Sequence, residues 1–128
     1  MAEQKFISTT SIGLFNGDKV TYSLLESDGQ TADFNADLSD CKDSIIAIID
    51  IPPTVGGTFQ LICKSVNGNK DIVVPLVSED VTVVRFTTLG IKDKDGFGHF
   101  TFVANSDAPV SMIQPKVAII KCIDAVNN

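Results

Sequence analysis

The chain has 128 residues and a formal net charge of −6, from 16 acidic and 10 basic side chains. This length suits a single domain, and the 44% hydrophobic content predicts a packed core instead of a disordered segment. The acidic balance disfavours nucleic acid and anionic membrane surfaces as partners, because binding to either draws on positive charge.

The N-terminal sequence lacks the basic start and the unbroken apolar stretch of a signal peptide. No stretch approaches the roughly 20 apolar residues that a transmembrane helix needs. The cysteines Cys41, Cys63 and Cys122 are odd in number and show no metal-type spacing, which favours buried free thiols. We therefore expect a soluble protein, made in the cytoplasm, with no cofactor, no metal and no membrane partner.

Residues 1–17 form a leader in which apolar residues are spaced through polar ones. Such an arm buries little surface by itself, but it can add a strand to the sheet edge of a partner. The alternative is that the leader folds onto its own domain as an ordinary first strand. The candidate contact residues of the arm are Phe6, Ile7, Ile12, Leu14 and Phe15.

After the leader, short β-rich runs alternate with turn signals. The first strand is predicted at Lys19–Leu25, and the polar stretch 30–43 is expected to be a long loop with room for a short strand or turn. Six further strands are predicted at Ser44–Ile51, Thr58–Ser65, Asp71–Val77, Val81–Thr88, Phe97–Ala104 and Gln114–Ile123.

Three of these segments carry more specific signals. Ser44–Ile51 is apolar on both alternating faces, which predicts a central strand that is covered on both sides, with a short buried helix as the alternative that periodicity leaves open. Asn67-Gly68 predicts a type I′ hairpin turn, since both central residues of that turn need positive φ. Pro75 predicts an edge strand or a bulge, because proline cannot donate to a ladder.

Short strands at this spacing, with Gly, Asn, Asp and Pro between them, predict an all-β fold. We expect a single antiparallel β-sandwich or small β-barrel, Ig-like or jelly-roll-like, with an extended N-terminal arm. The expected organisation is an arm over 1–17, a sandwich domain over 18–124 and a short frayed tail over 125–128.

The residues that carry chemistry form no catalytic pattern in the sequence. His99 is the only histidine, and a general base needs a partner that the fold supplies, so we interpret it as structural or surface-exposed. Asp93–Gly96 superficially resembles a calcium loop, but its glycine comes too early for an EF-hand, which favours a plain β-turn. We expect no enzymatic activity.

Several motifs follow one another in a recognisable order. They are a Lys-Asp turn before an aliphatic strand, a Gly-Thr-led strand, an Asn-Gly turn, an Asp-Ile-x-Val strand, a strand ending near a Phe, and a closing aliphatic strand. In this chain they are Lys42-Asp43-Ser44-Ile45, Gly57-Thr58-Phe59-Gln60-Leu61, Asn67-Gly68-Asn69, Asp71-Ile72-Val73-Val74, Val84-Arg85-Phe86 and Lys116-Val117-Ala118-Ile119-Ile120. Together they resemble the capsid decoration, or cement, proteins of tailed bacteriophages. Pro75 and the turn before the Val81 strand depart from that family, and the first 40 residues have no counterpart in it.

The resemblance implies a structural virion protein, made in the host cytoplasm and bound to the outer capsid surface. Its partner would be the major capsid protein, whose neighbouring subunits it would clamp, and it is expected to form a homotrimer on the lattice. One alternative is another phage structural subunit, from the tail tube or the head–tail connector. A second alternative is a carbohydrate- or cell-surface-binding module. Against it, Tyr22 is the only tyrosine and no tryptophan is present to stack on a sugar.

Overall fold

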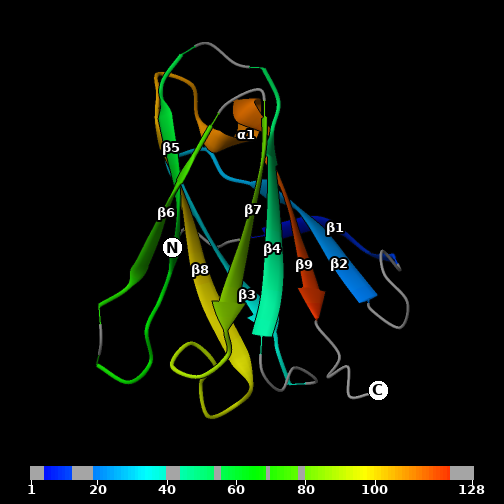
Figure 1. Ribbon diagram of the computed structural model, residues 1–128. Coiled ribbons are helices and arrows are strands. Elements are labelled where there is room, and N and C mark those ends of the chain that lie inside the picture. The colour runs from blue at the N-terminus through cyan, green and yellow to red at the C-terminus, as the bar shows by residue number, and fades with distance from the viewer. Residues whose placement is uncertain are drawn as a thin grey trace.

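The computed structural model describes residues 5–12, 19–39, 44–53, 56–68, 70–77 and 80–121. These residues form two antiparallel sheets that face each other, so the predicted β-sandwich is confirmed (Figure 1). The elements are β1 (Lys5–Ile12), β2 (Lys19–Glu26), β3 (Thr31–Asp37), β4 (Ser44–Ile51), β5 (Thr58–Cys63), β6 (Ile72–Leu76), β7 (Asp80–Thr87), β8 (Phe97–Asn105), α1 (Val110–Ile113) and β9 (Lys116–Lys121).

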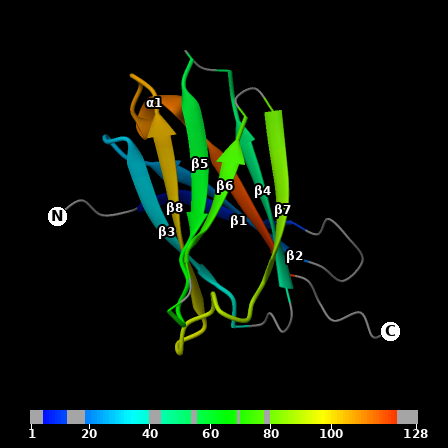
Figure 2. The same cartoon turned by 60° about the vertical axis from the view of Figure 1, so that its left-hand side comes forward.

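One sheet, here sheet A, has the strand order β1-β2-β9-β4-β7, and the other, sheet B, has the order β3-β8-β5-β6. The edge strands are therefore β1 and β7 in sheet A and β3 and β6 in sheet B. Figure 2 shows β6 and β7, which are consecutive along the chain, on the same side of the sandwich. The prediction that Pro75 lies in an edge strand is confirmed, since it belongs to β6.

The core lies between the two sheets and is centred on aromatic rings. Phe34 stacks on Phe100 with ring centroids 5.1 Å apart, and Phe59 stacks on Phe102 at 6.1 Å. Phe86 comes from sheet A and meets the edge of Phe100 at 5.9 Å, so one ring contact joins the two sheets. Aliphatic residues at alternate positions of β4 and β9 complete this core, namely Ile45, Ala47, Ile49, Ile51, Val117 and Ile119.

The strand β3 occupies part of the stretch that was expected to be a loop. Ala32 and Phe34 are buried, while the residues between and around them are exposed. β3 pairs with β8 along its whole length. Its sequence is polar because its outer face is exposed to solvent, and this polarity hid the strand.

A short helix that the sequence did not predict closes one end of the sandwich. In α1, Val110 and Ile113 are buried. The amides of Val110 and Ser111 donate to the carbonyl oxygens of Gly29 and Ser27, at 2.9 and 2.7 Å. The helix ends at Gln114, which has a φ of 54°. This backbone connection ties the β2–β3 turn to the segment that leads into β9.

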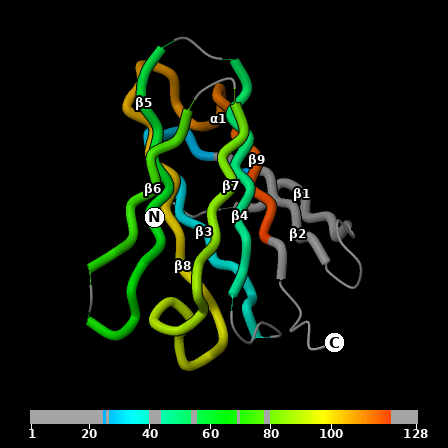
Figure 3. The backbone as a smooth tube through the Cα atoms, viewed as in Figure 1, coloured from blue at the N-terminus to red at the C-terminus, as the bar shows by residue number. Residues whose placement is uncertain are grey.

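The predicted type I′ turn at Asn67-Gly68 is wrong. Gly68 has a φ of 87°, but Asn67 is not among the residues with positive φ, and the connection spans residues 64–71. The side chain of Asp71 accepts the amide of Ser65 at 2.9 Å, which stabilises this wider loop. Its Val66 amide donates to the carbonyl of Gly90 at 2.8 Å, and the tube in Figure 3 shows both loops at the same end of the sandwich.

Cys63 is a buried free thiol, as the sequence predicted. Burial and, to a smaller extent, the nearby carboxylate of Asp71 together raise the pKa of its thiol to about 12. Cys41 and Cys122 lie outside the described residues, as do the predicted tail over 125–128 and the end of the leader over 13–17.

Candidate functional site

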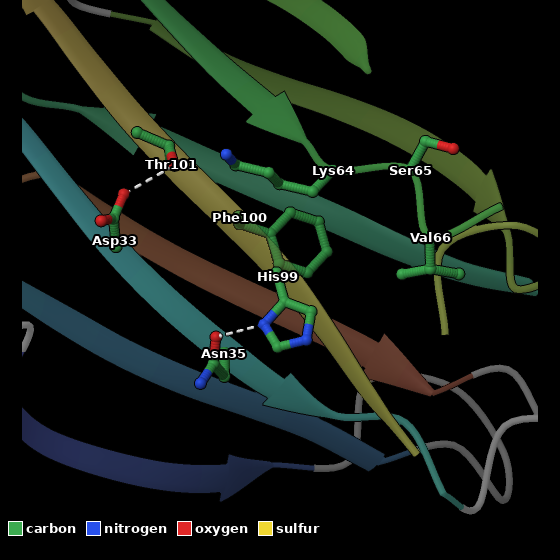
Figure 4. A pocket seen from close by; sticks show the side chains of 8 residues that line it. All are labelled: Asp33, Asn35, Lys64, Ser65, Val66, His99, Phe100 and Thr101. Carbon is green, nitrogen blue, oxygen red and sulfur yellow. Dashed lines mark hydrogen bonds between the residues drawn. The ribbon is translucent and has the colours of Figure 1, made fainter. Parts of the chain in front are cut away.

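A shallow pocket of about 420 Å³ lies on the outer face of sheet B (Figure 4). The cross-strand register places Asp33 opposite Thr101 and Asn35 opposite His99. These four side chains point outward because their neighbours Phe34, Phe100 and Phe102 point into the core. The residues that line the pocket are Asp33, Asn35, Lys64, Ser65, Val66, His99, Phe100 and Thr101.

His99 is held at both ring nitrogens. Nδ1 lies 2.8 Å from Oδ1 of Asn35, and Nε2 lies 2.7 Å from Oδ2 of Asp93. Both ring nitrogens are therefore within hydrogen-bond distance of a side-chain oxygen from another element. Sequence reasoning missed the Asn35 partner, because Asn35 comes from β3 and only the strand register brings it to His99.

Asp93 is the anchor of this network. Its Oδ1 accepts the amides of Asp95 and Phe97, at 2.8 and 2.9 Å. The pKa of the Asp93 carboxyl is lowered, chiefly by the Phe97 amide and next by the bond to His99, because both favour the charged form. The amide of Gly96 also donates to the Asp93 carbonyl at 3.0 Å, so the predicted β-turn is confirmed.

The geometry differs from that of a catalytic Asp–His pair. In such a pair, the second ring nitrogen of the histidine activates a hydroxyl or thiol nucleophile. Here the second nitrogen of His99 faces the amide oxygen of Asn35. The hydroxyl of Thr101 donates instead to Asp33, at 2.6 Å. The network therefore connects β3, β8 and the Asp93 turn to one another, and no group of three metal-ligating residues occurs in the described part of the chain.

The outer face of sheet A has a different character. Val83, Ile48 and Ala118 lie side by side on β7, β4 and β9. Ile46 and Ile48 pack on Ala118 in a small cluster that is separate from the core. We call this surface the aliphatic strip, and it comprises Ile46, Ile48, Val81, Val83 and Ala118.

The aliphatic strip is open to solvent at its β7 side. Val81 and Val83 are 50% and 62% exposed, while Ile46 and Ile48 are half-buried. The predicted covering of Ser44–Ile51 on both sides is therefore wrong for its outer face. The prediction that it is a central strand is confirmed, since β4 pairs with β9 on one side and β7 on the other. The apolar residues that suggested a covered strand are those of the strip.

The described candidate contact residues of the leader belong to a strand at the other edge of sheet A from the aliphatic strip. Phe6, Ile7 and Ile12 belong to β1, which pairs with β2 at the opposite edge of sheet A from β7. The Lys5–Ile12 part of the leader is thus a strand of its own domain. Leu14 and Phe15 lie outside the described residues. Contact between any of these five residues and a capsid stays a prediction.

No family model matches the chain, and no curated protein matches it. Among solved structures, the chain is similar to a family 11 carbohydrate-binding module from Clostridium thermocellum, determined in complex with a β-1,3-1,4-mixed-linked tetrasaccharide. The identity is 14%, the match covers 91% of this chain and 82% of the other, and the TM-score is 0.37. A similarity of this extent carries no argument about ligand or function. Within the described residues, no helix is long and apolar enough to cross a membrane.

Proposed function

We propose that this chain is a capsid decoration protein that binds the outer surface of a phage head through its aliphatic strip. The observation that carries the proposal is an apolar outer face on a sheet whose inner face already forms the core. Outer faces of antiparallel sheets are usually polar, and an exposed apolar patch rimmed by polar residues marks a surface that binds another protein.

The positions of the family-like motifs also support this proposal. The Gly57-Thr58 motif leads into β5, and the Asn67-Gly68 motif lies in the β5–β6 connection. The motif with Arg85 lies in β7, and the closing aliphatic motif forms β9. These motifs lie in strands and in a connection of the kind that the resemblance describes, while the Lys42-Asp43 turn lies outside the described residues. Three of the elements that carry them, β4, β7 and β9, build the strip.

The strip has the layout of an interface centre with a polar rim. In the register of sheet A, Arg85 lies opposite Ile46 at one end, while Asp50 and Lys116 lie opposite each other at the other end. Desolvation of the apolar centre would supply affinity, and the charged ends would fix orientation. A ligand that binds only the assembled shell stabilises that shell in proportion to its affinity and occupancy.

The test is co-sedimentation with expanded, emptied heads of the phage that encodes the chain. Ile48→Lys places a charge at the centre of the strip, and we expect a loss of at least about tenfold in affinity. The matched control is Ile62→Lys, which changes a half-buried isoleucine on the outer face of sheet B and should bind like wild type. Failure of the wild-type chain to sediment with heads, or equal binding by both variants, would overturn the proposal.

The pocket on sheet B favours a second candidate function, recognition of a carbohydrate. It combines a lysine donor, Lys64, with carboxylate and amide groups from Asp33 and Asn35, and such groups pair with sugar hydroxyls. Tyr22 belongs to β2 of sheet A, whereas the pocket lies on sheet B. Calorimetric titration with soluble oligosaccharides should then give heat that Asp33→Ala abolishes, and absence of heat with any glycan would eliminate this candidate.

A further inference from the structure

The pair Asn67-Gly68 lies in the connection between β5 and β6, where both residues are exposed. An asparagine followed by a glycine is chemically reactive, because the backbone nitrogen of the glycine can attack the side-chain amide carbon of the asparagine. Glycine favours this attack, since it has no side chain to shield its own nitrogen. Whether such a pair reacts in a folded protein depends on the hydrogen bonds that the fold gives to these two groups.

The backbone nitrogen of Gly68 is accessible as a nucleophile. Its amide makes no hydrogen bond to another residue that the structure describes. The φ of Gly68 is 87°, and a Cβ built at this position would meet no heavy atom within 4 Å beyond its chain neighbours. The nitrogen therefore lies in open surroundings, where a base in solution can take up its proton.

The side-chain carbonyl of Asn67 is polarised by a neighbouring hydroxyl. The Oγ of Ser65 donates to Oδ1 of Asn67 at 3.0 Å. When the glycine nitrogen adds to Cγ of Asn67, negative charge develops on Oδ1, and a donor that already points at this oxygen stabilises the charge. The backbone amide of Asn67 donates in turn to Oγ of Ser65 at 3.4 Å, which helps to keep the hydroxyl in place.

Two other described glycines follow an aspartate, and the fold engages the amides of both. The amide of Gly29 donates to Oγ of Ser27 at 3.1 Å. The amide of Gly96 donates to the carbonyl oxygen of Asp93 at 3.0 Å. The aspartate carboxyls that precede these glycines also react more slowly than an amide does. Among the described glycines that follow Asn or Asp, Gly68 alone combines an amide without a hydrogen bond to a described residue with a reactive neighbour.

We propose that Asn67 is a self-modification site, which the chain converts to aspartate and isoaspartate with help from the Ser65 hydroxyl. The Gly68 nitrogen forms a bond to Cγ of Asn67 and gives up its proton to solvent, while Nδ2 takes up a proton and leaves as ammonia. The product is a five-membered succinimide ring. Water then adds to one of the two ring carbonyls and opens the ring, which leaves a carboxylate on residue 67. Water is the only co-reactant that the two steps consume.

The modification changes the loop that forms one wall of the sheet B pocket. Ser65 and Val66 line this pocket (Figure 4), and the Val66 amide ties the loop to the carbonyl of Gly90 at 2.8 Å. A carboxylate at residue 67 adds negative charge to a loop that already holds the Asp71 carboxylate. Isoaspartate also lengthens the backbone by one carbon. The charge and shape of the loop thus change with the age of the protein, and this does not depend on the proposed capsid function.

The experiment is peptide mapping by mass spectrometry after incubation of the purified full chain, folded and in urea, at neutral and at alkaline pH. Conversion adds about one dalton to the peptide, and chromatography separates its aspartyl and isoaspartyl forms. We expect both products at residue 67, at a rate in the folded chain at least equal to that in urea. The rate should rise with pH, since the nitrogen must lose its proton. The map reports Asn16 separately, whose pair with Gly17 lies outside the described residues.

Three variants test the roles of the neighbouring groups. Ser65→Ala should slow the conversion about fivefold, because the hydrogen bond to Oδ1 is lost. Ser111→Ala, at a half-buried serine of α1, is the matched control and should leave the rate unchanged. Gly68→Ala should also slow it, because the methyl group shields the nitrogen and alanine resists positive φ. An Asn67 that stays intact in the folded chain while it converts in urea would overturn the proposal. So would aspartate without isoaspartate, or an unchanged rate in Ser65→Ala.

Discussion

The two outer faces differ most between the β3–β8 side of sheet B, which is polar, and the β4–β7 side of sheet A, which is largely apolar. Sheet B presents Asp33, Asn35, His99 and Thr101, which are hydrogen-bonded to one another or to the Asp93 turn. Sheet A presents the aliphatic strip, whose exposed side chains cannot satisfy one another in this way. The β3–β8 part of sheet B satisfies its polar side chains within one chain, while the aliphatic strip leaves surface that a partner would bury.

The largest expected effect on stability is that of a substitution in the core, between the two sheets. Phe100 contacts both Phe34 and Phe86, so Phe100→Ala opens a cavity where the sheets meet. We expect a loss of about 3–5 kcal/mol in the free energy of unfolding, measured by urea denaturation. Phe97→Ala, at a 38% exposed ring on the same strand, should cost considerably less. Equal losses would mean that the two sheets are not joined at this ring.

A smaller effect is expected at the anchor of the polar face. The folded-state pKa of Asp93 is lowered, so its ionised form stabilises the fold above the unfolded-state pKa, and this contribution is lost as pH falls through the folded-state pKa. Asp93→Asn should therefore lower the thermal midpoint at pH 7 and should match wild type at pH values below the folded-state pKa.

The control for this variant is Asp95→Asn, because the side chain of Asp95 makes no hydrogen bond to another described residue of the same turn. Its thermal midpoint should follow that of wild type across the pH range. A gap between Asp93→Asn and wild type that persists at low pH would show that the carboxylate charge is not the cause.

The smallest effect on stability is expected on the apolar face. Val81→Thr and Val83→Thr keep the β-branched shape at positions that are 50% and 62% exposed. Each should change the free energy of unfolding by no more than about 0.5 kcal/mol, because exposed positions contribute little to the fold. A loss above about 1.5 kcal/mol for either variant would show that the strip is a structural surface, and the contrast between the two faces would disappear.

The sequence predicted the strands best where burial alternates in the ordinary way. β5 buries Phe59, Leu61 and Cys63 and exposes or half-exposes the residues between them, as its pattern indicates. Seven predicted strands are confirmed to within one or two residues at the ends that the structure describes. Local alternation is enough for this, because each strand has one face in the core.

Two of the errors share a physical cause, which is that surface chemistry was read as a sign of local structure. β3 was hidden because its outer face is polar, and β4 was assigned a cover because its outer face is apolar. The Asn35–His99 contact spans 64 residues in sequence, so only the β3–β8 register reveals it. The Asp93–His99 contact was easier to predict from the sequence, because the two residues are six apart on either side of a glycine turn, and such a turn allows a hairpin contact.

Cys63 gives this sandwich a chemical reporter of its own opening. With a pKa of about 12, its thiol stays protonated at neutral pH and is a poor nucleophile while the fold is closed. A maleimide or iodoacetamide reagent would modify it only when β5 separates from its neighbours and the side chain meets water. In a chain with the other two cysteines replaced, the alkylation rate would thus report how often β5 separates from its neighbours in sheet B, without an added probe.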